Sequence, residues 1–320
     1  MRVWFPHPPS EQAARRLQTA AEGTQIAFGE ERPEGYEALI EGRPREEALE
    51  GQMGLRAVIV PFAGVPEGTL QLMRRYPHIA LYNLHHNAGD TAEVALALLL
   101  AAAKAVVPYD QRLRRNDWGP RYAPSGVSSL AGKTALILGY GNIGKRVARA
   151  LTAIDMRVLA TRRTAREEIE EGGAHVFPAE RLPELLPRSD VLVIALPETA
   201  ETNGLLGARE LALMPAGATL VNVGRGRIVE EGALFDALRR GHLHSAGLDV
   251  WYTYPQSGEE GSTAPSAYPF HELENVVMSP HRGGASMDTE THRMDALAHL
   301  LNALMRRDDM LNRVNLETGY

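Results

Sequence analysis

Residues 134–144 read Thr-Ala-Leu-Ile-Leu-Gly-Tyr-Gly-Asn-Ile-Gly, an apolar run that meets three glycines in the spacing G-x-G-x-x-G. An Ala-rich stretch typical of a helix follows, and a second apolar run occupies 157–160. This order of strand, tight turn, helix and strand is a βαβ unit, in which Gly139 permits the turn, Gly141 lets a pyrophosphate approach the backbone and Gly144 lets the helix pack on the strand. A phosphate would bind at the helix N-terminus, where free N–H groups and the helix dipole favour negative charge. The stretch therefore predicts a dinucleotide site rather than an ordinary turn.

The end of the second strand bears on the choice of cofactor. In NAD-binding units an acidic residue about 20 residues past the glycines bonds the ribose 2′-hydroxyl. Here that place holds Arg162 and Arg163, and the next carboxylate is Glu167. Because paired guanidinium groups suit a 2′-phosphate, we expect NADP as the preferred cofactor and NAD as the alternative. The competing interpretation is a solvated basic turn that opens a helix.

The composition bounds the class of protein. A chain of 320 residues with 44% hydrophobic and 23% charged residues is ordinary for a soluble globular protein of two domains. The absence of cysteine excludes disulfides, thiolate catalysis and cysteine-ligated metals. A net charge of −6 argues against nucleic-acid binding. The longest apolar run, 94–107, is too short to span a bilayer, and residues 1–9 lack a signal-peptide pattern. We expect a cytoplasmic protein without membrane or metal.

Strand-like and helix-like runs alternate along the whole chain. Such alternation predicts an α/β fold with parallel sheets. The expected strands are 1–5, 24–28, 57–60, 79–82, 134–138, 157–160, 191–196, 219–223, 245–250 and 275–278. The expected helices include 11–21, 91–105, 145–152 and 288–305.

Several motifs, taken together and in this order, resemble the D-isomer-specific 2-hydroxyacid dehydrogenase family. They are Asn87-Ala88-Gly89-Asp90-Thr91-Ala92-Glu93, the stretch from Arg114 to Trp118, the glycine motif, Leu196-Pro197-Glu198-Thr199-Ala200-Glu201-Thr202, Val221-Asn222-Val223-Gly224-Arg225-Gly226, Ala246-Gly247-Leu248-Asp249-Val250 and Ser279-Pro280-His281-Arg282-Gly283-Gly284. The resemblance implies two Rossmann-like, doubly wound parallel-sheet domains with a cleft between them. A discontinuous substrate domain would comprise 1–90 and 286–320, and the dinucleotide-binding domain 91–285.

The resemblance also implies the site residues. Arg225 would bind the substrate carboxylate and His281 would act as general acid and base; both follow strands, and both suit the chemistry of a 2-oxo acid. The other substrate contacts would be Ala63, Gly64 and Asn87. The remaining cofactor contacts would be Gly139, Gly141, Asn142, Ile143, Gly144, Arg162, Arg163, Leu196, Pro197, Thr202, Val223, Gly224, Asp249, His281 and Gly283. His85 and His86 either line the substrate pocket or are exposed loop residues.

One position departs from the family pattern. The family normally has a glutamate just before a proline, where it hydrogen-bonds the histidine and raises its pKa. Here Tyr254 precedes Pro255, and a loop with Glu259 and Glu260 follows. Either Tyr254 orients His281 by a neutral hydrogen bond, or a loop carboxylate swings in, or the reaction is slow or absent. Without an adjacent carboxylate, we expect the pKa of His281 to be lower than in the family pattern.

Two functions of different class follow. The first is an NADP-preferring oxidoreductase acting on a small D-2-hydroxy or 2-oxo acid such as glyoxylate or hydroxypyruvate, and formate or phosphite oxidation would use the same Asn87 and Arg225. The alternative is a catalytically weak or inactive nucleotide-sensing protein or corepressor on the same fold. The helix from Thr91 carries apolar residues around more of its circumference than packing on one core face requires. This favours a homodimer interface over a buried interdomain helix.

Overall fold

The computed structural model describes residues 1–308 and 311–319. Contacts between Cα atoms divide the chain into two compact units. Unit 1 consists of Met1–Asn87 and Ala285–Tyr320, and unit 2 consists of Ala88–Gly284.

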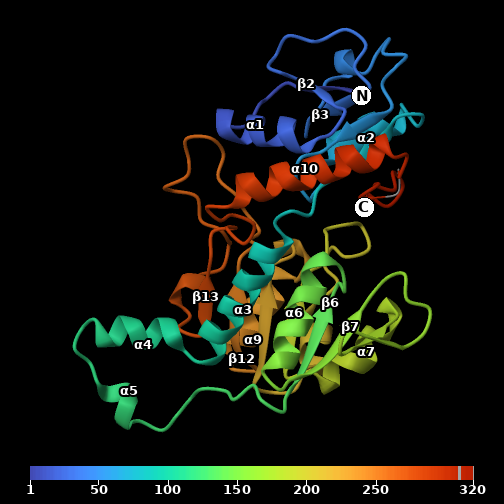
Figure 1. The fold of residues 1–320 in the computed structure, drawn as a ribbon. Coiled ribbons are helices and arrows are strands. Elements are labelled where there is room, and N and C mark those ends of the chain that lie inside the picture. Colours follow the sequence, from blue (N-terminus) through green and yellow to red (C-terminus); the bar gives the residue numbers. More distant parts are fainter. Residues whose placement is uncertain (309–310, 320) are drawn as a thin grey trace. The chain divides into compact units, whose positions relative to one another are not determined.

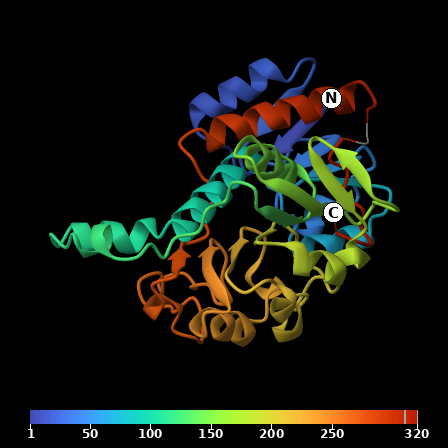
Figure 2. The ribbon, with the colours of Figure 1, turned by 90° about the horizontal axis from the view of Figure 1, so that it is seen from below.

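Unit 1 is built on a five-stranded parallel sheet in the order β2-β1-β3-β4-β5, the order of flavodoxin-like folds. Its strands are β1 (Arg2–Phe5), β2 (Gln25–Phe28), β3 (Ala38–Ile40), β4 (Ala57–Ile59) and β5 (Ala80–Tyr82), and its helices are α1 (Glu11–Ala20), α2 (Glu67–Arg74) and α10 (Thr289–Met305). α1 and α10 lie side by side in both views although they are far apart in the sequence (Figures 1 and 2). Leu17 of α1 and Leu297 and Leu301 of α10 join one buried cluster with the sheet, which is how the C-terminal segment becomes part of this unit.

Unit 2 is built on an eight-stranded sheet in the order β13-β12-β11-β10-β6-β7-β9-β8, parallel except for β8. Its strands are β6 (Thr134–Leu138), β7 (Arg157–Thr161), β8 (Ile169–Glu171), β9 (Ala174–Phe177), β10 (Val191–Ile194), β11 (Ala218–Asn222), β12 (Leu243–Leu248) and β13 (Val276–Met278). Its helices are α3 (Ala88–Ala103), α4 (Val106–Leu113), α5 (Gly119–Tyr122), α6 (Asn142–Ala153), α7 (Leu182–Leu185), α8 (Ala208–Leu213) and α9 (Glu231–Arg239). The strand order reverses between β6 and β10, and ligands of such sheets bind beside the carboxyl ends of the strands at this point.

The central strands of unit 2 are covered on both faces, which explains their uninterrupted apolar sequence. Alternate residues of β6 enter different clusters: Ala135 and Ile137 pack with α3 and α6, whereas Leu136 and Leu138 pack with α7, α8 and α9. Figure 1 shows α3 and α6 side by side, and these two helices are in direct contact. The predicted α/β fold class with parallel sheets is confirmed.

Several features differ from the sequence expectations, among them strand β3, which is absent from the expected strands. The helix expected at 91–105 is α3, which begins at Ala88 and ends at Ala103, and its packing on α6, β11 and β12 accounts for much of its apolar character. The antiparallel hairpin of β8 and β9 was not expected. Within residues 1–308 and 311–319, no single helix is long and apolar enough to cross a membrane; α3 and α4 pass that test only as a pair bent by 64°.

Candidate active site

The glycine motif joins β6 to α6 beside the point where the strand order reverses. Gly139 has a φ of +96°, and a Cβ on it would lie 2.8 Å from the carbonyl oxygen of Ala195, just past β10. A Cβ on Gly144 would lie 2.1 Å from the carbonyl oxygen of Gly139, so helix and strand approach too closely for any side chain. A Cβ on Gly141 would meet no atom within 4 Å, and Asn142 and Ile143 open α6 at this place. The backbone at Gly141 therefore faces open space, as a nucleotide phosphate would require.

Three charged side chains gather beside the ends of β6 and β7. Glu171, at the end of β8, forms two ion pairs. One carboxylate oxygen lies 2.6 Å from Lys145 Nζ, and the other lies 2.7 Å from Arg162 Nη1. Hydrogen bonds from both cations hold the pKa of Glu171 below its ordinary value. Glu171 is thus the nearest carboxylate to Arg162, although Glu167 is nearer in sequence. Arg163 follows Arg162 and is exposed.

The loop after β10 is held by its own threonine. Thr202 donates its hydroxyl to the Pro197 carbonyl at 2.7 Å and accepts the Thr199 N–H at 2.8 Å. A Cβ on Gly224 would lie 2.6 Å from the carbonyl oxygen of Leu196. The loops after β10 and β11 therefore touch through backbone atoms, and Val223, buried in the core, carries the chain to Gly224.

Arg225 stands on the loop after β11. Asn222, the buried last residue of that strand, donates its side-chain amide to the Arg225 carbonyl at 2.9 Å and accepts the Gly224 N–H at 3.0 Å. The Arg225 guanidinium donates to the Gly224 carbonyl at 2.7 Å and is partly exposed. Asn222 thus orients the backbone from which the guanidinium projects.

His281 stands on the loop after β13, in a left-handed backbone conformation with a φ of +55°. Asp249, 1% exposed at the end of β12, anchors this loop. Its carboxylate accepts hydrogen bonds from the Ser279 hydroxyl, from the Arg282 N–H at 2.9 Å and from the Gly283 N–H at 2.8 Å. Asp249 therefore positions the backbone around His281, and the expected contact of Asp249 with the cofactor stays a prediction.

Trp251 ties the two loops together. Its indole N–H donates a hydrogen bond to the Ser279 carbonyl at 2.8 Å. Its backbone packs against Gly226 so closely that a Cβ on this glycine would lie 2.3 Å from the Trp251 carbonyl oxygen. Arg225 and His281, on loops separated by more than fifty positions in sequence, are thereby brought together. Exclusion of water, followed by the positive charge of Arg225, lowers the pKa of His281, and Asp249 opposes this effect.

The aromatic ring of Tyr254 contacts the imidazole of His281. The two ring centroids lie 5.4 Å apart with an interplanar angle of 53°. The carboxylates of Glu259 and Glu260 instead accept backbone N–H groups within their own loop, from Gln256 and Gly258 respectively. The lowered pKa of His281 agrees with the expectation drawn from the missing glutamate.

The substrate residues predicted near the N-terminus lie on two neighbouring loops of unit 1. Ala63 and Gly64 follow β4, Asn87 follows β5, and these strands pair in the sheet. Asn83 joins the loops by donating its side-chain amide to the Ala63 carbonyl at 2.7 Å. His85 is partly buried, and the loss of water lowers its pKa.

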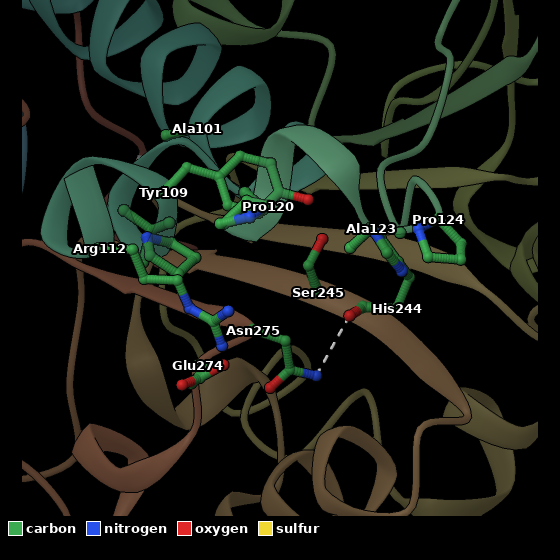
Figure 3. Close-up of a pocket in the computed structure, with 15 residues that line it drawn as sticks. Ala101, Tyr109, Arg112, Pro120, Ala123, Pro124, His244, Ser245, Glu274 and Asn275 are labelled. Atoms are coloured by element: carbon green, nitrogen blue, oxygen red, sulfur yellow. Dashed lines mark hydrogen bonds between the residues drawn. The ribbon is translucent and has the colours of Figure 1, made fainter. Parts of the chain in front are cut away.

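A separate hollow of about 320 Å³ lies at the other end of the unit 2 sheet (Figure 3). Tyr109 and Arg112 of α4 form one wall, and Ser245 and Asn275, at the starts of β12 and β13, form another. Because Arg225 and His281 follow the carboxyl ends of strands, this hollow is not the candidate active site.

Sequence reasoning missed Glu171, Trp251 and Asn222. Gly172-Gly173, both with positive φ, is a hairpin signal that could have placed Glu171 on a strand end. No local pattern marks Trp251 as a support of the site, because Ser279, which accepts its indole N–H, lies in another loop. The partners of Asn222, Gly224 and Arg225, lie in its own loop, so its place at the strand end was the available signal.

Comparisons with known proteins agree with this architecture. The sequence profile described as D-isomer specific 2-hydroxyacid dehydrogenase, NAD binding domain, matches residues 96–283. The chain is 41% identical over 235 residues to a glyoxylate reductase from Aeropyrum pernix and 37% identical over 233 residues to one from Pyrococcus horikoshii, each time covering 71% of this chain and 66% of the relative. A solved structure from Xanthobacter autotrophicus Py2, described as a D-isomer specific 2-hydroxyacid dehydrogenase in complex with NADPH and MES, has a TM-score of 0.80 at 25% identity and covers 100% of this chain and 99% of that one. The matched part of the chain thus spans just under two thirds of the length of these curated relatives. The glycine motif, the strand order of unit 2 and the matched profile together show that the chain belongs to the D-isomer-specific 2-hydroxyacid dehydrogenase family.

Proposed function

We propose that the protein is an oxidoreductase that transfers hydride between NADP(H) and a small 2-oxo or 2-hydroxy acid of the D configuration. The observation that carries the proposal is the pairing of Arg225 and His281. They stand on two strand-end loops joined by Trp251, and the charge of Arg225 acts on the imidazole.

The two side chains divide the chemistry. Arg225 binds the substrate carboxylate through its planar fork and polarises the adjacent carbonyl. His281 gives a proton to the carbonyl oxygen during reduction and takes it back during oxidation. The bound nicotinamide supplies or accepts the hydride.

The nucleotide is assigned to the carboxyl ends of β6, β7, β10 and β11. Gly141 and the first turn of α6 would hold the pyrophosphate, and the Thr202 and Gly224 loops would border the nicotinamide side. NADP is proposed over NAD because the carboxylate at this strand end, Glu171, is paired with two cations, Lys145 and Arg162. Two cations against one carboxylate leave a net positive cluster, which suits a 2′-phosphate. The neighbour from Xanthobacter autotrophicus was solved with NADPH.

Glyoxylate is the first substrate to test, because several relatives are described as glyoxylate reductases. Steady-state rates would be measured with glyoxylate, hydroxypyruvate and pyruvate, each against NADPH and NADH. We expect turnover that favours NADPH. Turnover favouring NADH would retain the enzyme and reject the cofactor assignment. Tight nucleotide binding without turnover of any acid would favour the nucleotide-sensing alternative.

Arg225→Ala tests the carboxylate contact. The loss of a charge-assisted hydrogen bond costs about 1.5–3 kcal/mol, which is roughly a 10- to 150-fold fall in kcat/KM. The matched control is Arg227→Ala, an exposed arginine two residues further along the same segment. Equal losses in the two variants would contradict the role of Arg225.

We further propose that the protein forms a homodimer through the segment that contains α4 and α5. This segment exposes large apolar side chains, among them Val106 (52%), Leu113 (49%), Trp118 (59%) and Tyr122 (80%). Several large apolar side chains exposed along one segment are typical of an interaction site. Sedimentation velocity should give a dimer for the wild type and a monomer for Trp118→Glu/Tyr122→Glu; a monomeric wild type would refute the assignment.

A further inference from the structure

We propose that Tyr254 is the positioning residue of His281 and that it acts through its aromatic ring. The proposal rests on the proposed function, because it assumes that His281 is the acid and base of the site. It gives the tyrosine a different task from that of the glutamate that the family normally has at this place.

The ring contact is direct. Tyr254 and His281 lie on different loops of unit 2, and their ring centroids are 5.4 Å apart at 53°. This separation is within the range in which aromatic pairs attract each other. Tyr254 is 46% exposed, so a substitution there leaves the core of unit 2 intact. Within residues 1–308 and 311–319, the ring that contacts the His281 imidazole is that of Tyr254.

The hydroxyl of Tyr254 is used elsewhere. It accepts a hydrogen bond from the backbone N–H of Trp251 at 3.1 Å, which closes the turn between Trp251 and Tyr254. Trp251 is 6% exposed, packs edge to face on Phe270, and donates its indole N–H to Ser279, two residues before His281. The hydroxyl is thus engaged with the backbone of Trp251, and it is the ring that limits the positions of the imidazole.

The presence of Tyr254 where the family normally has a glutamate affects the protonation of His281, because few charges act on the imidazole. Arg225 and Asp249 are the charged groups that act on His281, and exclusion of water comes first among the causes that lower its pKa. Burial also raises the pKa of the Tyr254 phenol, on which Glu198 acts as well, so the ring stays uncharged near neutral pH. An uncharged ring orients the imidazole without stabilising its protonated form. The neutral base, ready for oxidation, is therefore favoured, and the proton donor needed for reduction is populated at acid pH.

Three variants of Tyr254 distinguish the contributions of its ring, its hydroxyl and its lack of charge. Tyr254→Phe keeps the ring, Tyr254→Leu removes it, and Tyr254→Glu places a carboxylate there. The pKa of His281 would be measured by NMR titration of the nucleotide-free protein, with its signal identified by loss in His281→Gln. Because this readout needs neither substrate nor cofactor, it decides the proposal even if no tested acid is turned over.

We expect Tyr254→Phe to keep the wild-type pKa of His281 and the wild-type pH profile. Tyr254→Leu should raise that pKa towards its ordinary value, since water regains the ring face, and lower kcat about 10- to 100-fold through misorientation. Tyr254→Glu should raise the pKa by about 1–3 pH units and extend reduction to higher pH.

The matched control is Tyr268→Leu, which removes another half-exposed ring of unit 2, one that packs on Phe235 at 5.3 Å. It should leave the pKa of His281 unchanged. The proposal is overturned if Tyr254→Leu matches the wild type in both readouts, if Tyr254→Phe behaves like Tyr254→Leu, or if Tyr254→Glu leaves the pKa unchanged. Nucleotide affinity and melting temperature establish that each variant is folded.

Discussion

Replacing Asp249 by asparagine should destabilise unit 2 although the two side chains have nearly the same shape. One carboxylate oxygen accepts the Ser279 hydroxyl and the Arg282 N–H, and the other accepts the buried Gly283 N–H at 2.8 Å. An asparagine keeps one oxygen. With its oxygen facing Ser279 and Arg282, its NH₂ group points at the Gly283 N–H, so two donors oppose each other where water has no access.

The expected cost follows from these contacts. A hydrogen bond to a charged group contributes about 1.5–3 kcal/mol, and the Gly283 N–H loses its acceptor entirely. We therefore expect Asp249→Asn to lower the free energy of unfolding by about 2–4 kcal/mol. For a unit of this size each kcal/mol corresponds to about 2–4 °C, so the melting temperature should fall by roughly 4–16 °C.

Differential scanning calorimetry would measure the change, with Asp236→Asn as the matched control. The Asp236 carboxylate is 45% exposed and pairs with Arg239 and Arg240 on the surface of the same unit. Exposed pairs contribute at most about 1 kcal/mol, so the control should melt close to the wild type. Equal melting temperatures for the two variants would refute the assignment of Asp249 as the anchor of the His281 loop.

Three further outcomes are expected. Gly144→Ala should abolish NADPH binding in calorimetric titration, because its Cβ would lie 2.1 Å from the Gly139 carbonyl oxygen, and wild-type affinity would contradict this reading. Glu171→Gln should raise the ratio of NADPH to NADH affinity by releasing two cations for the 2′-phosphate, and an unchanged ratio in fluorescence titrations would count against the charged cluster. Since reduction consumes the protonated form of His281, whose pKa lies below the ordinary value of a histidine, kcat for reduction should fall as pH rises through that lowered pKa. A rate undiminished well above neutral pH would disprove this dependence.

Much of the fold was accessible from the sequence because its signals are local. The glycines of 134–144 stand between an apolar run and a helix, so the motif is recognisable from neighbouring residues alone. Arg225 and His281 were predicted because each follows an apolar strand, because the carboxyl ends of parallel strands share one edge of the sheet, and because the motifs around them resemble those of the family.

The supports of the site could not be read in this way. Glu171 reaches Arg162 only because an antiparallel hairpin returns beside β7. The sequence left open whether Tyr254 would meet His281 by its hydroxyl, and tertiary packing turns the ring towards the imidazole while Trp251 engages the oxygen.

By itself, then, the sequence determined the parallel α/β fold and the nucleotide motif and singled out Arg225 and His281 as the proposed reactive side chains, because these signals lie in residues close together in the chain. Tertiary structure decided which groups surround those side chains and which way each partner faces. The physical reason is that the donors, acceptors and rings that meet at Asp249, Trp251 and Tyr254 come from separate loops, and their pairing is set by how the loops pack rather than by any local pattern.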